Sequence, residues 1–423
     1  MNEIKRDSSR HPCFNPQVKG ECGRVHLPVA PSCNIRCNYC NRRFDCVNES
    51  RPGVTSALLR PEQARSYLAE VLAREPRITV AGIAGPGDPF ANPQETMTTL
   101  RLVRQDFPAL LLCLATNGLG IMPYVDELAE LGVSHVTVTV NAVDPAIGAR
   151  IYGWVREGKV IYRGATGAQL LLARQEEAIR RLSAHGLTIK INTVIIPGIN
   201  DQHAPAVAAR MRELGASLHN CMAMVPNADT PLAEVVPPAP AALEAIREKC
   251  GQHLPQMRHC TRCRADAVGL LGDDRQQEFG ACLATHSRRV PATADRPHVA
   301  VATMEGMLVN EHLGAAGRFQ IWTRTADGFQ LLEERPAPAP GGGEGRWQAL
   351  ARTLGDCRAV LVSGIGDTPE RILRAAGIEP VTMAGFIASG LAAVYGGGSV
   401  SHLRVRRASG AGSGCSGKGG GCL

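Results

Sequence analysis

The stretch CNIRCNYC, residues 33–40, places three cysteines at the spacing C-x3-C-x2-C. Cysteine thiolates hold iron–sulfur clusters, usually four thiolates for a cluster of the 4Fe-4S type. Three thiolates from Cys33, Cys37 and Cys40 would leave one iron open to bind a substrate or cofactor. A structural zinc site with a remote fourth ligand and a set of plain buried cysteines are the alternatives. The spacing favours an iron–sulfur centre with an open iron.

The chain has more cysteines than one such centre needs, fifteen in 423 residues. Cys46 follows the triad, Cys113 lies in an apolar stretch, and Cys260 and Cys263 form the pair HCTRC. The odd count and local clustering argue against a disulfide framework and favour at least one further cluster, more readily two. For Cys113 a place in the core is the alternative, and for the pair a zinc knuckle. We interpret as structural the isolated cysteines Cys22, Cys221, Cys250, Cys282 and Cys357.

These cysteines lie on a chain in which apolar β-type runs alternate with helical patterns. Six alternating β/α units predict a parallel sheet, which could curl into a full or partial barrel with its active site at the C-terminal strand ends. We expect strands at 25–30, 78–85, 110–116, 133–140, 187–196 and 218–226. We expect helices near 61–73, 94–106, 122–131, 169–185, 203–214 and 240–250.

Polar or glycine-rich segments follow several of the expected strands, at residues 85–88 (GPGD), 116–118 (TNG) and 197–201 (PGIND), and at Thr139 and Asn141. Each of them alone is also what an ordinary turn contains. Because the carboxyl ends of parallel strands meet on one face, their co-occurrence favours a binding site there.

The sequence divides into five expected parts. Residues 1–24 form an N-terminal segment that carries Cys13, and the barrel spans 25–285. A linker is expected at 286–297, a second α/β domain at 298–405, and a flexible Gly-rich tail with Cys415 and Cys422 at 406–423. In the second domain we expect strands at 298–303, 319–324, 329–335, 359–365 and 379–385, and helices at 346–354 and 368–377.

Charge and hydropathy exclude some classes of function. The net charge of +7 is mild for this length, and no dense Lys/Arg block predicts nucleic-acid binding. The first residues lack the apolar stretch of a signal peptide, and no run of 18 apolar residues predicts a membrane span. A cytoplasmic location, where thiols stay reduced, is expected.

The triad resembles that of the radical S-adenosylmethionine (SAM) superfamily. Longer stretches resemble the NifB family over about residues 11–285, namely HPCFN, GRVHLPVAPSCNIRCNYCNRRFDCVNESRPGV, AGPGDPFAN, TNGL, VTVTVNAVDP, VIIPGIND and HCTRCRADAVGLLG. The part after residue 297 resembles a NifX/NifY-type cofactor-carrier domain. The resemblance implies a partial (β/α)6-type TIM barrel of the radical SAM kind, followed by a smaller, ribonuclease-H-like α/β domain.

The resemblance also implies three 4Fe-4S clusters and their ligands. The SAM-binding cluster would be held by Cys33, Cys37 and Cys40, and one auxiliary cluster by His26, Cys46 and Cys113. Cys260 and Cys263 would hold the other auxiliary cluster, and Cys13 would serve one of the two. Since an imidazole anchors iron less firmly than a thiolate, we expect His26 to retain its cluster and then release it.

For SAM itself, the resemblance implies contacts on the strand-end face. Gly87 and Asp88 stand where the superfamily usually has a Gly-Gly-Glu-like loop, a departure that leaves backbone carbonyls to bind the methionine ammonium. Tyr39 would contact the adenine. The other SAM contacts that we predict are Asn117, Thr139, Asn141 and Ile191. Near Cys46, we expect Glu49 and Arg51 to handle protons or to support the ligands, with a solvated loop as the alternative.

The implied reaction is the synthesis of an eight-iron precursor of the nitrogenase cofactor. One SAM would methylate a sulfide of an auxiliary cluster, and a second would yield the radical that abstracts hydrogen from that methyl. The carbon would become a carbide as both clusters fuse with an extra sulfur. Implied partners are an electron donor such as ferredoxin or flavodoxin, iron–sulfur cluster donors, and downstream carrier and scaffold proteins. Another radical SAM enzyme with auxiliary clusters, or a non-enzymatic iron–sulfur scaffold, is the alternative.

Overall fold

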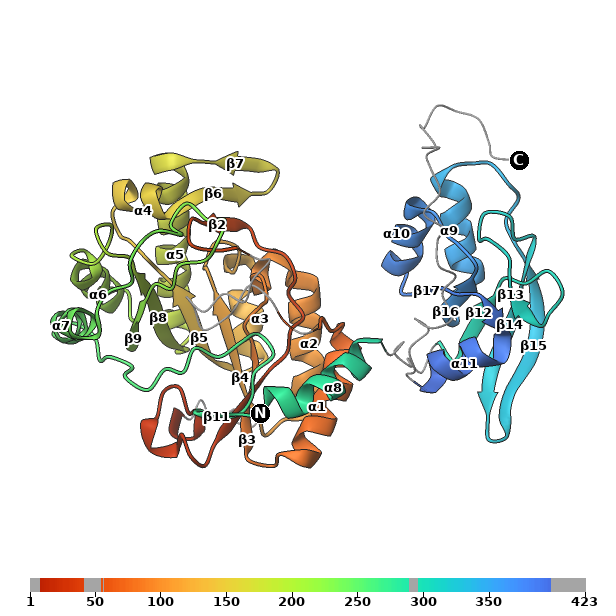
Figure 1. Cartoon of the computed structure of the whole chain (residues 1–423), viewed down its shortest axis with the longest axis horizontal. Coiled ribbons are helices and arrows are strands. Elements are labelled where there is room, and N and C mark those ends of the chain that lie inside the picture. The colour runs from red at the N-terminus through yellow and green to blue at the C-terminus, as the bar shows by residue number, and fades with distance from the viewer. Residues whose placement is uncertain (1–7, 42–54, 56, 289–295, 397–423) are drawn as a thin grey trace. The chain divides into compact units, whose positions relative to one another are not determined.

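The protein is described by a computed structural model that covers residues 8–41, 55, 57–288 and 296–396. The chain divides into two compact units between residues 287 and 288, and each unit is described by itself. Figure 1 shows a twisted sheet with flanking helices in both units.

The first unit is built on a sheet of eight strands in the order β11-β10-β1-β3-β4-β5-β8-β9. Six of these strands are parallel and confirm the six expected from the sequence. They are β1 (Gly23–His26), β3 (Ile78–Ile83), β4 (Leu111–Thr116), β5 (Val133–Thr139), β8 (Thr188–Ile195) and β9 (Leu218–Ala223). Every residue of β3 and β5 is buried, as expected for parallel strands covered on both faces.

Two short strands extend the sheet beyond β1. β10 (Val268–Leu270) runs antiparallel to β1, and β11 (Asp273–Asp274) runs antiparallel to β10. Since β11 and β9 are not paired with each other, the sheet stays open between its two edges. The predicted barrel is therefore a partial one.

Helices cover the outer face of this sheet (Figure 1). The six expected helices are present as α1 (Pro61–Arg74), α2 (Pro93–Asp106), α3 (Val125–Glu130), α5 (Gly164–Ala184), α6 (Ala204–Glu213) and α7 (Pro240–Gly251). The sequence did not predict α4 (Pro145–Ile151) or α8 (Gln276–Arg288). Several helices start with proline, whose fixed φ suits the first helical position. α8 occupies the first three residues of the predicted linker.

A small antiparallel sheet lies at the cysteine triad. It consists of β2 (Ile35–Cys37), β6 (Tyr152–Glu157) and β7 (Val160–Tyr162), with β6 in the middle. The middle strand of this sheet comes more than a hundred residues after the triad. Through this pairing, the connection between α4 and α5 supports the loop of the predicted SAM cluster.

The second unit has a five-stranded sheet in the order β15-β14-β12-β16-β17. β14 (Arg318–Thr325) is antiparallel to both neighbours, β12 (His298–Val301) and β15 (Gly328–Pro336), whereas β12, β16 (Cys357–Val362) and β17 (Glu379–Thr382) are parallel. This agrees with the expected ribonuclease-H-like fold. The remaining elements are α9 (Glu344–Thr353), α10 (Asp367–Ala375), α11 (Ile387–Gly396) and the pair β13 (Leu308–Val309) and β18 (Gly385–Phe386).

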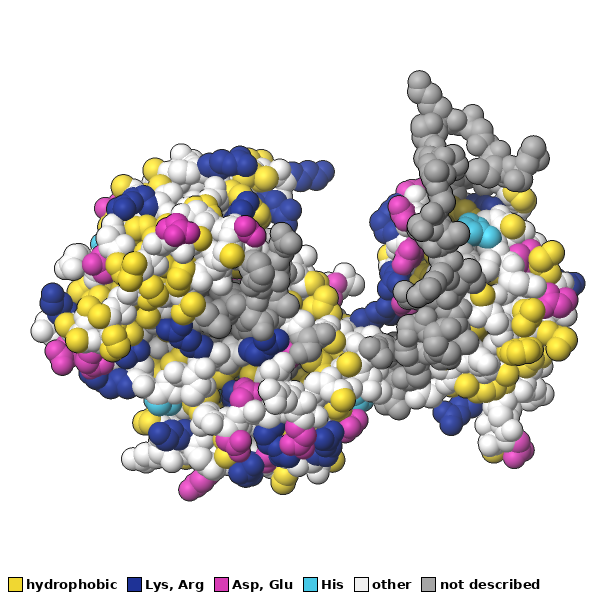
Figure 2. Space-filling model, in the orientation of Figure 1, with side chains coloured by type: hydrophobic (Ala, Val, Ile, Leu, Met, Phe, Trp, Pro, Cys, Tyr) yellow, Lys and Arg dark blue, Asp and Glu magenta, His cyan; other side chains and the backbone are white. Residues whose placement is uncertain are grey.

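Alternation along β12 gives the second unit two apolar cores. Ala300 packs with residues of α9 and α10, while Val299 and Val301 pack with residues of α11. Some large apolar side chains of this unit remain exposed (Figure 2), among them Leu331, Leu332 and Phe386. In the described part of both units, no helix is long and apolar enough to cross a membrane.

Candidate functional site

The loop that carries Cys33, Cys37 and Cys40 follows β1 and is held on two sides. Cys37 pairs with Tyr152 of β6, and the Asn38 N–H donates to the Ile151 carbonyl at 2.8 Å. All three cysteines pack against one apolar cluster. A single supported loop thus gathers the three predicted thiolate ligands, a donor set that fits an iron–sulfur cluster with one open iron.

Gly87 brings the predicted strand-end loop against the residue before Cys33. Its N–H donates to the Ala30 carbonyl at 2.6 Å, and the Asp88 N–H donates to the Ser32 carbonyl at 2.8 Å. A Cβ atom at position 87 would lie only 2.0 Å from the Ser32 oxygen, so no other residue fits without a backbone shift. The GPGD segment and the cysteine loop are therefore one packed unit.

Asp88 has a structural role that the sequence did not indicate. Its carboxylate is fully buried and accepts hydrogen bonds from the Asn117 N–H at 2.6 Å, the Phe90 N–H at 2.9 Å and the Thr116 hydroxyl at 3.0 Å. These bonds tie the end of β3 to the end of β4. With its side chain used in this way, contact with SAM would fall to nearby backbone carbonyls, which remains a prediction.

Two asparagines connect other strand ends to the cysteine loop. Asn117 donates to Asn34 Oδ1 at 2.7 Å and lies 3.9 Å from Cys33 Sγ. Asn141 donates to the Tyr39 hydroxyl at 2.9 Å, and Tyr39 is only 1% exposed. These residues therefore position the loop, while their predicted contacts with SAM stay predictions.

Thr139 and Ile191, two further predicted SAM contacts, lie on the neighbouring strands β5 and β8. The Thr139 carbonyl accepts a hydrogen bond from Gln175 at 2.9 Å, beside the Asn117 carbonyl. Ile191 is fully buried in the core between the sheet and the helices. Because side chains alternate along a strand, it points away from the barrel interior that its neighbour Lys190 faces. This placement argues against Ile191 as a cofactor contact.

A cavity on the inner face of the sheet gathers most of the predicted auxiliary ligands. We call it the lumen cavity, and its lining includes Cys13, His26, Cys113, Cys260 and Cys263, with His11, Arg24 and Lys190. The ligands come from the N-terminal segment, β1, β4 and the connection between α7 and β10. Cys46, Glu49 and Arg51 lie outside the described residues. The sequence divided these ligands between two clusters, and the fold brings them to one space.

His26 is oriented as a metal ligand would be. Its Nδ1 lies 2.7 Å from the Arg264 carbonyl oxygen, so Nδ1 carries the proton and Nε2 keeps its lone pair. Burial and the Arg24 charge lower the pKa of His26 to about 4, which favours the neutral ring. Gly82 leaves room for the imidazole, since a Cβ there would lie 3.1 Å from His26 Cδ2.

The thiols of the lumen cavity are buried or half-buried. Burial raises the pKa of Cys13 to about 11 and that of Cys113 to about 12, so cluster binding must release protons. Arg24 Nε and Nη2 lie 3.2 and 3.1 Å from Cys263 Sγ, and Nη2 also pairs with Asp274 at 2.6 Å. The guanidinium therefore stands ready to stabilise a thiolate at Cys263.

Sequence reasoning missed Arg24, Lys190 and His11. A signal existed for Lys190, because a single lysine inside the apolar strand LTIKINTVII must be buried with a partner. His11, two residues before Cys13, lies in the stretch HPCFN but was not predicted as a site residue. No comparable signal distinguished Arg24 from a surface arginine.

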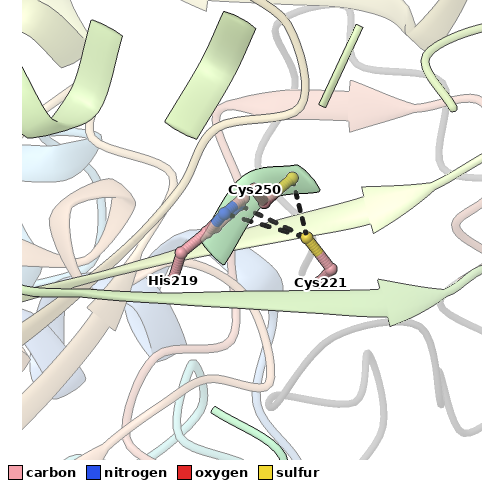
Figure 3. A group of neighbouring side chains, drawn as sticks. All are labelled: His219, Cys221 and Cys250. Carbon is pink, nitrogen blue, oxygen red and sulfur yellow. Dashed lines mark hydrogen bonds between the residues drawn. The ribbon is translucent and has the colours of Figure 1, made fainter. Parts of the chain in front are cut away.

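A second group of cysteine and histidine side chains lies outside the lumen cavity, between β9 and α7 (Figure 3). Cys221 Sγ is 3.8 Å from Cys250 Sγ, and His219 lies beside both. The His219 ring nitrogens already contact Thr193 at 2.9 Å and Gln256 at 3.2 Å. All three side chains are fully buried in or beside an apolar cluster, which agrees with the structural role predicted for Cys221 and Cys250.

Comparison with protein families separates the two units. Residues 27–211 match the radical SAM superfamily. Residues 296–397 match the family described as dinitrogenase iron-molybdenum cofactor. The triad therefore lies in a radical SAM domain, and the second unit corresponds to a cofactor-related domain.

Relatives match nearly the whole chain. The FeMo cofactor biosynthesis protein NifB of Chlorobaculum tepidum is 49% identical over 417 residues, 97% of this chain and 98% of that protein. The protein of the same name from Klebsiella pneumoniae is 42% identical over 406 residues, 88% of this chain and 87% of that protein. Among solved structures, Streptococcus suis SuiB aligns at a TM-score of 0.42 and 13% identity, over 58% of this chain and 53% of that one.

Proposed function

Because this chain belongs to the NifB family of radical SAM enzymes in FeMo cofactor biosynthesis, we propose that it makes an eight-iron precursor of the nitrogenase cofactor. In this proposal two 4Fe-4S clusters fuse around a carbide derived from SAM and gain one extra sulfur. The observation that carries it is the position of Cys260. This residue lines the lumen cavity and also packs against the apolar cluster that supports Cys33, Cys37 and Cys40.

The cysteine loop suits a resident cluster. When bound, a 4Fe-4S cluster supplies the electron that cleaves SAM to a 5′-deoxyadenosyl radical. The protein contributes the three thiolates, the Gly87 contact that fixes the start of the loop, and the Asn141–Tyr39 bond that fixes its end. These groups hold the reacting centre in place, which is the protein's share of such chemistry.

The residues around the lumen cavity supply ligands for clusters that would be substrates. We assign His26 and Cys113, with Cys46, to one auxiliary cluster, and Cys260 and Cys263 to the other. One SAM would donate a methyl group to a cluster sulfide, leaving S-adenosylhomocysteine. The radical formed from a second SAM would remove one hydrogen atom from that methyl and become 5′-deoxyadenosine.

The fused cluster must leave the lumen cavity at the end of the reaction, and the ligands there would allow its release. A neutral imidazole at His26 is a weaker anchor than a thiolate. We also propose that a ferredoxin or flavodoxin donates electrons, that other proteins deliver clusters, and that carrier and scaffold proteins receive the product. The exposed apolar side chains of the second unit support a role in such transfer.

The test is product analysis under anaerobic conditions. Reconstituted protein with SAM and a reductant should form both 5′-deoxyadenosine and S-adenosylhomocysteine. Replacing the triad by Cys33→Ser, Cys37→Ser and Cys40→Ser should abolish 5′-deoxyadenosine. Replacing Cys260 and Cys263 by serine should abolish the eight-iron product while some 5′-deoxyadenosine persists, because one of the two clusters to be fused has lost its ligands. Loaded wild-type protein without S-adenosylhomocysteine would contradict methyl transfer.

A further inference from the structure

Lys190 is a buried cation on the inner face of β8. It lines the lumen cavity and is 4% exposed. Its Nζ lies 3.8 Å from Met257 Sδ and 5.5 Å from the centre of the Phe14 ring. Within the described residues, no carboxylate pairs with this ammonium. A thioether and an aromatic ring face compensate poorly for the water that a buried ammonium loses.

The groups around Lys190 that can become anionic are sulfur atoms. The described residues that line the lumen cavity with Lys190 include no aspartate or glutamate, but they include Cys13, Cys113, Cys260 and Cys263. These four cysteines are predicted cluster ligands. The lysine charge is therefore balanced only when sulfur in the cavity is ionised, as it is in a bound iron–sulfur cluster.

Arg24, the other cation of the cavity, shows what a fully satisfied buried charge looks like. Its guanidinium pairs with Asp274 at 2.6 Å and donates to the Gly269 and Leu270 carbonyls at 2.6 and 2.9 Å. Arg24 thus has a carboxylate and two carbonyl partners besides its contact with Cys263 Sγ. Lys190 has no carboxylate or carbonyl partner among the described residues, so its ammonium can interact with a ligand in the cavity.

His11 presents a second donor to the same cavity. The Cys13 N–H donates to His11 Nδ1 at 3.2 Å, so the proton of the neutral ring resides on Nε2. His11 Nε2 is buried without a hydrogen-bond partner, in a residue that is 2% exposed. Its tautomer is opposite to that of His26, so His11 offers an N–H where His26 offers a lone pair.

Because Lys190 Nζ has only a weak thioether acceptor and His11 Nε2 has none, we propose that these two donors form the sulfur-facing side of the lumen cavity. They donate hydrogen bonds to the sulfides or thiolates of an auxiliary cluster, and the lysine compensates part of its negative charge. His11 and Lys190 are positioning residues, and neither is a ligand of iron. The inference rests on the proposed function only in taking an iron–sulfur cluster as the guest of this cavity.

A purely structural role predicts a different outcome on substitution. If Lys190 only filled space against Met257 and Phe14, a methionine of similar length would replace it without loss. If its charge acts on the cluster, methionine must alter the cluster's reduction potential. A nearby positive charge or N–H···S bond stabilises the reduced, more negative cluster and raises the potential.

The first experiment is a potentiometric titration followed by electron paramagnetic resonance. The triad is replaced by Cys33→Ser, Cys37→Ser and Cys40→Ser, so that only auxiliary clusters contribute. Lys190→Met should shift the potential to lower values, and Lys190→Arg should restore it toward the starting value. The matched control is Lys159→Met, because Lys159 is exposed. An unchanged potential in iron-loaded Lys190→Met would overturn the proposal.

The second experiment does not substitute Lys190, so it still tests the proposal if Lys190→Met fails to fold or to bind clusters. In the same triad-free background with Lys190 and His11 intact, lysine labelled with ¹⁵N at Nζ should show a ¹⁵N coupling to the reduced auxiliary cluster in pulsed resonance spectra. The coupling should vanish in labelled Lys190→Arg protein. Its absence while Lys190 is intact would refute the contact. Neither measurement uses SAM, so failure of carbide synthesis would leave both results standing.

Discussion

Gly87→Ala tests whether the GPGD segment and the cysteine loop act as one packed unit. The added Cβ would start 2.0 Å from the Ser32 oxygen, and real contacts of this kind are at least about 3.0 Å. The two segments must therefore separate by about 1 Å. The bonds from Gly87 N–H to Ala30 and from Asp88 N–H to Ser32, at 2.6 and 2.8 Å, cannot both survive that shift.

The magnitude follows from those two bonds. Leaving buried backbone groups unpaired costs roughly 1–3 kcal/mol each, so a local loss of about 2–6 kcal/mol is expected for the two bonds. Hydrogen–deuterium exchange of the amides at positions 87 and 88 should then accelerate by a factor of about 30 to 25,000, if local opening governs exchange. Because Ser32 precedes Cys33, the displacement should also lower 5′-deoxyadenosine formation, by up to about 100-fold for a misplacement of this size.

The matched control is Gly20→Ala. Its Cβ would meet no heavy atom within 4 Å, and its φ lies outside the left-handed region. We expect this variant to exchange and to cleave SAM like the unaltered protein. Our reasoning fails if Gly87→Ala behaves like Gly20→Ala in both assays, since the close contact would then not constrain the loop.

Three further predictions concern other sites. Gly82→Val should crowd the His26 imidazole, because even a Cβ at position 82 would lie only 3.1 Å from His26 Cδ2. The variant should hold less auxiliary iron but keep the cluster of the triad, as measured by iron analysis and electron paramagnetic resonance. Gly280→Ala should raise the unfolding free energy by about 0.5–1 kcal/mol, because the site is helical and open, and a lower thermal midpoint would contradict this. The Arg335 guanidinium holds the pKa of Asp356 at about 2, so their pair stabilises the second unit above about pH 4 and loses this effect as the pH falls toward 2. Arg335→Met should flatten that acid dependence in tryptophan fluorescence, and an unaltered pH profile would count against it.

The long elements were readable from sequence because each carries its own periodicity. The all-buried β5 and the amphipathic α5 satisfy their patterns within one segment, although α5 begins five residues before the predicted 169–185. The short strands β2, β6 and β10 have no such pattern. They form because distant partners pair with them, as Cys37 does with Tyr152, and three to six residues cannot encode that partner.

The cysteine ligands of the candidate site could be predicted from the sequence, because a thiol side chain and its spacing indicate metal or cluster binding. The C-x2-C spacing predicts Cys260 and Cys263 as ligands, but their convergence with Cys13 depends on the whole fold. Ile191 shows the limit most clearly. One register step separates it from Lys190, and only the sheet decides which of the two faces the interior. The burial of Asp88 could not be predicted either, because its hydrogen-bond partners come from later in the chain or from backbone groups.

The two groups of cysteines also differ in when they can exist during synthesis of the chain. The triad is contained within eight residues near the start. The lumen cavity takes His11 and Cys13 from one end of the unit and Cys260 and Cys263 from the other, so it is complete only after about 260 residues have been made. Iron delivered to the nascent chain on the ribosome would meet the triad before the lumen cavity has formed. Auxiliary clusters bound there could therefore be loaded only after the whole first unit has been synthesised.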